Sequence, residues 1–269
     1  MKNLSTGGAD SFYSNIGVIN YGYVYALVLS TPFMLKRYIC ESKSLKRIYC
    51  FFLLILTLLF IYSTGFMTAL LLVIIGMYLV ILFSPNNKHI SIVTVFCILV
   101  LVLFIGKGDV ADLLAVVSSK VEVYSLKERI IQIQSFLVYG DMGDTLERFE
   151  LYAQSLQLFI SSPLYGSLLS GGTYSISGHS EVLDTLAHGG LILLTPFLLF
   201  HMYYFFWLLP CSSISYRSSI YAIIVMYFIL STINTTFSSQ AIWCFIFIVL
   251  PTLVNYYHQG HDRESSLAL

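Results

Sequence analysis

The chain has 269 residues, of which 57% are hydrophobic and 10% charged, with a mean hydropathy of +0.81 and a formal net charge of zero. A soluble domain carries roughly 25% charged residues, whereas residues 48–87, 185–216 and 218–260 contain no Asp, Glu, Lys or Arg. Stretches of this length exclude a soluble core, and the balanced charge gives no basic patch for nucleic acid. The composition predicts an all-α polytopic membrane protein.

Seven apolar runs approach the roughly 20 residues that a helix needs to cross a bilayer core. The first is interrupted by Asn20, Gly22 and Pro32, and the sixth ends in a polar run over residues 231–236, whose polar groups should find partners on neighbouring helices or in a wet cavity. The predicted spans cover roughly residues 18–35, 48–63, 66–83, 90–106, 189–209, 218–236 and 239–257.

Lysine and arginine in the short loops predict the orientation of these spans. The loop after the first span is expected in the cytoplasm because it holds five basic residues and one acid, namely Lys36, Arg37, Lys43, Lys46 and Arg47 with Glu41. Alternation then puts Lys88, Arg217 and the tail with Arg263 inside as well. The chain divides into spans one to four (1–106), a large extracytoplasmic loop (107–188), and spans five to seven with the tail (189–269).

This orientation leaves the N-terminus outside, although residues 1–15 do not resemble a signal peptide. Either the first span inserts as a reverse anchor or further helices precede it, and we favour the second. The five cysteines show no CxxC or Cys/His metal spacing, so we expect small buried side chains rather than disulfides or metal ligands.

Apolar periodicity predicts two ordered helices in the large loop. One follows the three- and four-residue spacing from Val123 to Leu137, and it would lie on the membrane surface or pack on the bundle. The second begins at Asp144, a suitable N-cap, and runs to about Ser161 before Pro163. Its residues Arg148, Tyr152 and Ser155 share one face.

A glycine-containing stretch follows and leads to His179, after which residues 181–188 are expected to form a helical turn that enters span five at residues 189–190. An ordered loop with a histidine, an arginine and several carboxylates is a frequent setting for a site. The alternative is a solvated cap that only covers the bundle.

Four short motifs in this loop occur in a recognisable order. They are residues 147–149 (Glu-Arg-Phe), 162–166 (Ser-Pro-Leu-Tyr-Gly), 178–180 (Gly-His-Ser) and 186–192 (Leu-Ala-His-Gly-Gly-Leu-Ile). In this order and spacing the segment resembles the bacterial O-antigen polymerase and ligase superfamily, especially repeat-unit polymerases of the Wzy type. The arrangement of spans around one large external loop is also similar.

The chain departs from that family in two respects. Members usually have ten or more spans, so seven implies an N-terminally shortened member. Many members, ligases in particular, also carry an arginine in the earlier external turn, where this chain has Ser-Thr-Gly-Phe-Met-Thr-Ala over residues 63–69. The absent arginine favours a polymerase over a ligase, and it puts full activity in question if that arginine holds the donor diphosphate.

The resemblance implies an inverting glycosyl transfer without metal or cofactor, which joins oligosaccharides carried on polyprenyl diphosphate at the outer leaflet. Negative charge develops on the diphosphate, and Arg148 is the motif-matched cation because guanidinium pairs phosphate oxygens bidentately. His179 is the motif-matched base for the acceptor hydroxyl. Arg129 and Lys127 are second-line cations without motif support. Glu181 and Asp184 are candidates for orienting His179 or for binding sugar hydroxyls, and Tyr152 is a candidate for stacking on a sugar ring.

The same resemblance implies a multi-pass protein of the bacterial cytoplasmic (inner) membrane, with membrane lipid around it and a chain-length regulator and a flippase as partners. Simpler interpretations remain for each residue. Arg148 would pair with Asp144 or Glu147 on a solvated helix face, His179 would be a loop residue without a role, and His188 would be a helix-end or interfacial residue.

Three other functions compete with a polymerase. A ligase would pass finished polymer to another acceptor, and the sequence separates it poorly from a polymerase. A transporter or flippase predicts ionisable residues within spans or inverted repeats, and the spans show little of either beyond residues 231–236 and His201. A non-catalytic scaffold predicts that His179 and Arg148 can be replaced freely.

Overall fold

The structure is a computed structural model that describes residues 21–84, 107–139, 144–169, 180–237 and 239–257. Every regular element in these ranges is helical. The chain forms two units, one of Met1–Gly143 with Ser218–Ile223 and one of Asp144–Arg217 with Ile224–Leu269. This division follows packing, whereas the predicted division at residues 106 and 188 follows membrane topology and remains a prediction.

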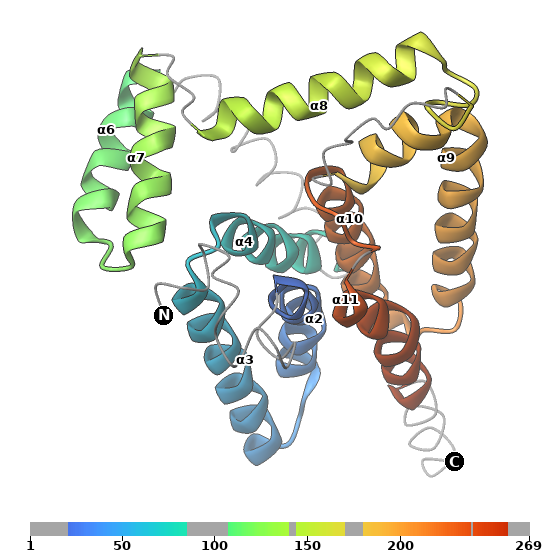
Figure 1. The fold of residues 1–269 in the computed structure, drawn as a ribbon. Helices are drawn as coiled ribbons and strands as arrows, with labels where there is room; N and C mark the ends of the chain where they lie inside the picture. The colour runs from blue at the N-terminus through green and yellow to red at the C-terminus, as the bar shows by residue number, and fades with distance from the viewer. Residues whose placement is uncertain (1–20, 85–106, 140–143, 170–179, 238, 258–269) are drawn as a thin grey trace, which may run out of the picture. The chain divides into compact units, whose positions relative to one another are not determined.

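The first unit is built on α2 (Tyr21–Cys40), which packs against α3 (Ser44–Thr64) and α4 (Met67–Leu82) (Figure 1). Pro32 lies inside α2 and cannot donate a backbone hydrogen bond to Val28. The Thr31 hydroxyl donates to the Val28 carbonyl instead, at 2.7 Å. This local replacement explains how α2 continues through a proline.

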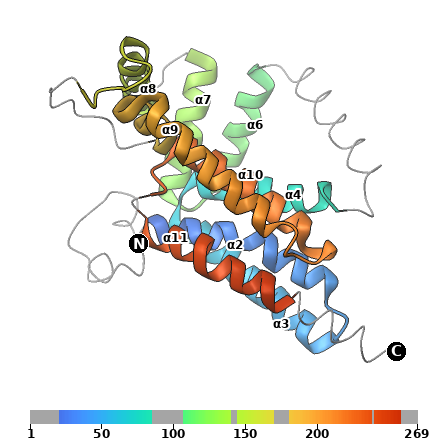
Figure 2. The ribbon, with the colours of Figure 1, turned by 90° about the vertical axis from the view of Figure 1, so that its right-hand side faces the viewer.

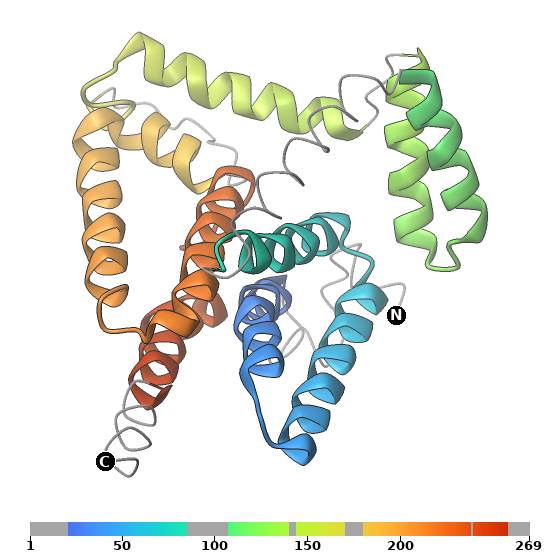
Figure 3. The ribbon, with the colours of Figure 1, turned by 180° about the vertical axis from the view of Figure 1, so that it is seen from behind.

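A helical hairpin completes the first unit. Helix α6 (Lys107–Lys120) packs along α7 (Tyr124–Tyr139), and Figure 3 shows the two side by side from behind. Gly65 ends α3 with a φ of 74°, and a Cβ there would overlap the Ser125 side chain at the start of α7. The turn between α3 and α4 therefore contacts this hairpin.

The second unit contains α8 (Asp144–Ser161), α9 (Glu181–Leu208), most of α10 (Arg217–Ile233) and α11 (Gln240–Cys244), which continues as a helix to Tyr257. Helix α8 packs against α9 (Figure 2). Helix α9 changes direction at Gly190, where φ is 58° and ψ is −150°. Helices α7 and α8 confirm the two helices predicted for the loop.

Four described helices are long and apolar enough to cross a membrane: Ser44–Thr64, Glu181–Leu208, Ile214–Ile233 and Gln240–Tyr257. They match the second, fifth, sixth and seventh predicted spans and indicate a polytopic membrane protein. The third predicted span corresponds to the shorter apolar helix Met67–Leu82, and the first to α2, which is not among the four. The predicted span at residues 90–106 lies outside the described residues, so the number seven stays a prediction.

Candidate functional site

The turn after α8 fills the break in α9. In an unbroken α-helix the amide of Leu191 would pair with the Ala187 carbonyl. Here it donates to the carbonyl of Pro163 at 2.9 Å, and the Ala187 carbonyl accepts from Ser167 at 2.8 Å. The amide of Ile192 likewise donates to Leu164 at 3.2 Å. Backbone groups of the turn after α8 thus form hydrogen bonds with the backbone groups that the break in α9 leaves without helical partners.

Glycine is required on both sides of this contact. Gly190 has φ 58° and ψ −150°, and a Cβ on it would lie 2.5 Å from the Pro163 carbonyl oxygen. Gly166 has φ 55°, and its Cβ would lie 2.5 Å from the Ala187 carbonyl oxygen. A side chain at either position meets both backbone strain and rigid backbone atoms. The motifs at residues 162–166 and 186–192 are therefore in direct contact through their backbones.

The start of α9 is tied to α8 through Asp184. Ser180 caps α9 by accepting a hydrogen bond from the Leu183 amide at 3.2 Å. Asp184 Oδ2 accepts from the Ser180 amide at 3.3 Å, and Asp184 Oδ1 accepts from the Ser155 hydroxyl of α8 at 3.4 Å. Ser155, Ser180 and Asp184 are all buried. Asp184 therefore positions the two helices relative to each other.

Glu181 and Tyr152 contact the segment that links α10 to α11. Glu181 Oε2 accepts from the Phe237 amide at 2.9 Å, and the Glu181 amide donates to the Asn234 carbonyl at 3.2 Å. The Tyr152 hydroxyl donates to the Ile233 carbonyl at 3.2 Å. Residues 233–237 are thereby held against α8 and the start of α9.

Glu181 is half-buried and forms no ion pair with any described residue. It lies before the break at Gly190, outside the apolar part of α9 that begins at Leu191. Burial raises the pKa of its carboxyl, and the nearby carboxylate of Asp184 acts in the same direction. The amides of Phe237 and Thr236 oppose this rise without cancelling it.

The structure brings together three of the predicted site residues, namely Tyr152, Glu181 and Asp184. Arg148 belongs to α8, one turn before Tyr152, and its side chain lies outside the described part of the chain. His179 also lies outside the described residues and directly precedes Ser180 in sequence. Arg129 is an exposed residue of α7 in the other unit, where it donates to Gln132 at 2.8 Å, so the structure does not group it with the others.

Sequence reasoning missed that Asn234 and Phe237 contact Glu181 through their backbone. The available signal was the polar run at residues 231–236. This run predicts hydrogen-bond partners for its polar groups, but it does not indicate which residues those partners are. Its other groups pair within the bundle, because the Ser231 hydroxyl donates to the Tyr227 carbonyl at 2.9 Å and lies 3.2 Å from the Thr236 hydroxyl.

His201 is the ionisable residue within a predicted span, and both of its ring nitrogens have protein partners. Nε2 lies 2.9 Å from the Tyr227 hydroxyl, and Nδ1 lies 2.8 Å from the Phe197 carbonyl. The ring is fully buried among aromatic side chains. These contacts are those of a structural residue inside the bundle. Among the described residues, no group of three His, Cys, Asp or Glu side chains is placed to hold a metal ion.

Comparisons with protein-family models, with curated proteins and with solved structures gave no match to this chain.

Proposed function

We propose that the protein is a membrane glycosyltransferase that joins polyprenyl-diphosphate-linked oligosaccharide repeat units into O-antigen or capsular polysaccharide at the outer leaflet. The observation that supports it most is the docking of the Pro163–Leu164 backbone into the break of α9. This contact joins two of the four motifs on which the family resemblance rests. It lies in the same unit as the cluster of Tyr152, Glu181 and Asp184.

In the proposed reaction an acceptor hydroxyl oxygen attacks the anomeric carbon of the donor sugar from the side opposite the diphosphate. The bond between that carbon and the phosphate oxygen breaks, and the diphosphate leaves with the electron pair. His179 takes the proton of the hydroxyl, and the guanidinium of Arg148 pairs with the developing charge of the diphosphate. Inversion follows from the single displacement, and no metal or cofactor takes part.

The described residues would bind the sugars. Glu181 accepts a hydrogen bond from a sugar hydroxyl, and the ring of Tyr152 offers an apolar face to a sugar ring. Asp184 would be a positioning residue that does not touch the sugar, because its two oxygens already accept from Ser155 and from the Ser180 amide. His179 directly precedes Ser180 in the chain. By accepting from the Ser180 amide, Asp184 would therefore help to fix the position of the His179 backbone.

Deletion of the gene in its own strain, with surface polysaccharide length read on a gel, tests this proposal. The wild-type gene should restore long ladders, whereas Arg148→Ala and His179→Ala should leave single repeat units. The matched controls are Arg217→Ala and His188→Ala, which remove exposed residues of the same types.

Ladders that survive both Arg148→Ala and His179→Ala would overturn the assignment of the site. Long chains that remain on the polyprenyl carrier in the deletion strain, without transfer to the cell-surface acceptor, would identify a ligase instead. Repeat units that accumulate only on the cytoplasmic side would identify a flippase.

A further inference from the structure

The connection between α2 and α3 gathers positive charge. Five basic residues lie within it or next to it and are opposed by one acid, which leaves four positive charges without a balancing acid (five minus one). The first turn of α3 contains no acidic residue. The basic residues are Lys36, Arg37, Lys43, Lys46 and Arg47, and we call this set with Glu41 the basic turn.

Glu41 is committed to one of these cations. Its carboxylate forms an ion pair with Arg37, and its Oε1 accepts a hydrogen bond from the Lys43 amide at 3.3 Å. That hydrogen bond and the positive charges of Arg37, Lys46 and Lys43 lower the pKa of Glu41. The ammonium groups of Lys43 and Lys46 form no hydrogen bond or ion pair with any described residue.

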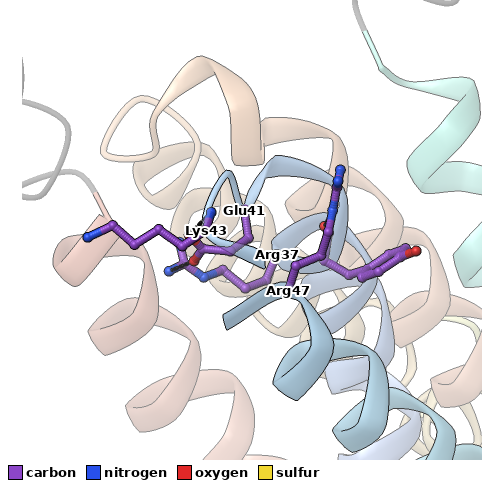
Figure 4. Close-up of polar contacts among 5 residues, drawn as sticks. Arg37, Glu41, Lys43 and Arg47 are labelled. Atoms are coloured by element: carbon purple, nitrogen blue, oxygen red, sulfur yellow. Dashed lines mark hydrogen bonds and ion pairs between the residues drawn. The ribbon is translucent and has the colours of Figure 1, made fainter. Parts of the chain in front are cut away.

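Arg47 is held in place beside this pair. Its Nε donates to the Tyr38 carbonyl at 3.4 Å, and its guanidinium carbon lies 5.7 Å from the centre of the Tyr38 ring. Figure 4 shows the Lys43 and Arg47 side chains extending to opposite sides of the Arg37–Glu41 pair. Lys36 is buried, so the exposed cations of the basic turn are Lys43, Lys46 and Arg47.

An apolar stripe runs along α3 directly beside these cations. Its residues repeat at three- and four-residue spacing, so they share one face of the helix. All are more than half exposed: Leu45 at 82%, Ile48 at 64%, Tyr49 at 62% and Phe52 at 58%. The surface combines exposed cations with exposed apolar side chains within two turns of one helix.

We propose that the basic turn and this stripe bind anionic phospholipid, with the lysines on the headgroup phosphates and the stripe against the acyl chains. A phospholipid has an anionic phosphate for the cations and acyl chains for the apolar stripe. Helix α3 is long and apolar enough to cross a bilayer, so its first turn would lie at the depth of the headgroups. A free anion would use the cations alone. The inference depends on α3 crossing a membrane and does not depend on the proposed reaction.

Native mass spectrometry of the full chain in neutral detergent tests this inference, with phosphatidylglycerol, phosphatidylethanolamine or inorganic phosphate added separately. The wild type should retain phosphatidylglycerol in preference to the other two. Lys43→Gln with Lys46→Gln should weaken phosphatidylglycerol binding by about tenfold or more, since each cation near a lipid surface contributes on the order of a few-fold. The matched control is Lys120→Gln with Lys127→Gln, which removes two exposed lysines from the α6–α7 hairpin.

Lys43→Arg with Lys46→Arg should keep the binding, which separates loss of charge from loss of fold. Equal retention of phosphatidylglycerol by the wild type and the Lys43/Lys46 glutamine variant would overturn the inference. An equal loss in the Lys120/Lys127 control would also overturn it, because binding would then follow net charge. Displacement of the lipid by inorganic phosphate would identify a site for small anions.

Discussion

Asp184 and Glu181 begin the same helix, yet their carboxylates have different surroundings. Asp184 is buried and uses both oxygens on protein donors, Ser155 and the Ser180 amide. Glu181 is half-buried, and Oε2 accepts from the Phe237 amide. Burial disfavours its charged form, and no described cation compensates. Burial of this carboxylate without a cation does not stabilise the fold, so its position is more consistent with a role in ligand binding than with a role in stability.

Glu181→Gln should make stability less dependent on pH. Because the pKa of Glu181 is raised in the folded protein, the folded state holds a proton that the unfolded state has lost as pH rises above the ordinary value of 4.5. Stability from this group is therefore complete below that value and is lost as pH rises through the raised pKa. The thermal midpoint of the detergent-solubilised wild type should fall across this interval more than that of the variant.

The variant should be at least as stable as the wild type at neutral pH, and it should make shorter polymer in the deletion strain. A variant whose midpoint follows the wild-type pH profile would contradict the raised pKa. Full-length polymer from the variant would remove Glu181 from the sugar-binding residues.

Tyr152 can be tested by separating its hydroxyl from its ring. Tyr152→Phe removes the hydrogen bond to the Ile233 carbonyl and should cost about 0.5–1.5 kcal/mol of unfolding free energy, with polymer length preserved. Tyr152→Ala also removes the ring and should shorten the polymer. Thermal unfolding and gel ladders of both variants measure the two effects. Polymer of wild-type length from Tyr152→Ala would show that the ring does not contact sugar.

The junction between the turn at residues 162–168 and the break in α9 could be predicted only in part. Proline and glycine marked a turn near residue 163, and the glycine pair marked the entry into span five. The hydrogen bonds from Leu191 to Pro163 and from Ser167 to Ala187 had no local signal, because their partners are separated by 28 and 20 residues in sequence. Single-residue patterns report helix faces and ends, but they do not report which ends pair.

Gly190→Ala should open this junction. The added Cβ meets the Pro163 carbonyl oxygen at 2.5 Å, and the backbone strain alone should cost about 1–3 kcal/mol. Hydrogen exchange followed by mass spectrometry should show slow exchange of residues 162–168 in the wild type and fast exchange in the variant, with α3 unchanged. Thr195→Ala, at an exposed position later in α9, is the control. Equal protection in Gly190→Ala and the wild type would contradict the docked turn.

For the molecule as a whole, four of the seven predicted spans coincide with helices long and apolar enough to cross a membrane, because about twenty apolar residues in sequence already favour such a helix. The amphipathic helix after Val123 and the helix from Asp144 followed from three- and four-residue spacing in the same way. Glu181 was singled out by its position close to His179 in the sequence, and its contact with Phe237 arises from packing between elements that the sequence does not encode locally. The orientation in the membrane rests on the loop lysines and arginines.

Cysteine labelling of intact cells tests that orientation. Ser42→Cys between α2 and α3 and Gln157→Cys in α8 both replace exposed residues, and each would be introduced into a chain whose five cysteines have been replaced. A membrane-impermeant maleimide should label Gln157→Cys in intact cells and Ser42→Cys only after lysis. Labelling of both before lysis, or the reverse pattern, would contradict an external loop at residues 107–188.

The most direct test of the proposed function is polymer synthesis by the purified full chain in liposomes. The substrate is the lipid-linked repeat unit extracted from the deletion strain, which should accumulate it. The account predicts a ladder of longer products with one polyprenyl diphosphate released for each linkage, and a rate lower by about 100-fold or more in His179→Ala. A wild-type chain that leaves the repeat units unjoined, or a His179→Ala variant that joins them at the wild-type rate, would contradict it.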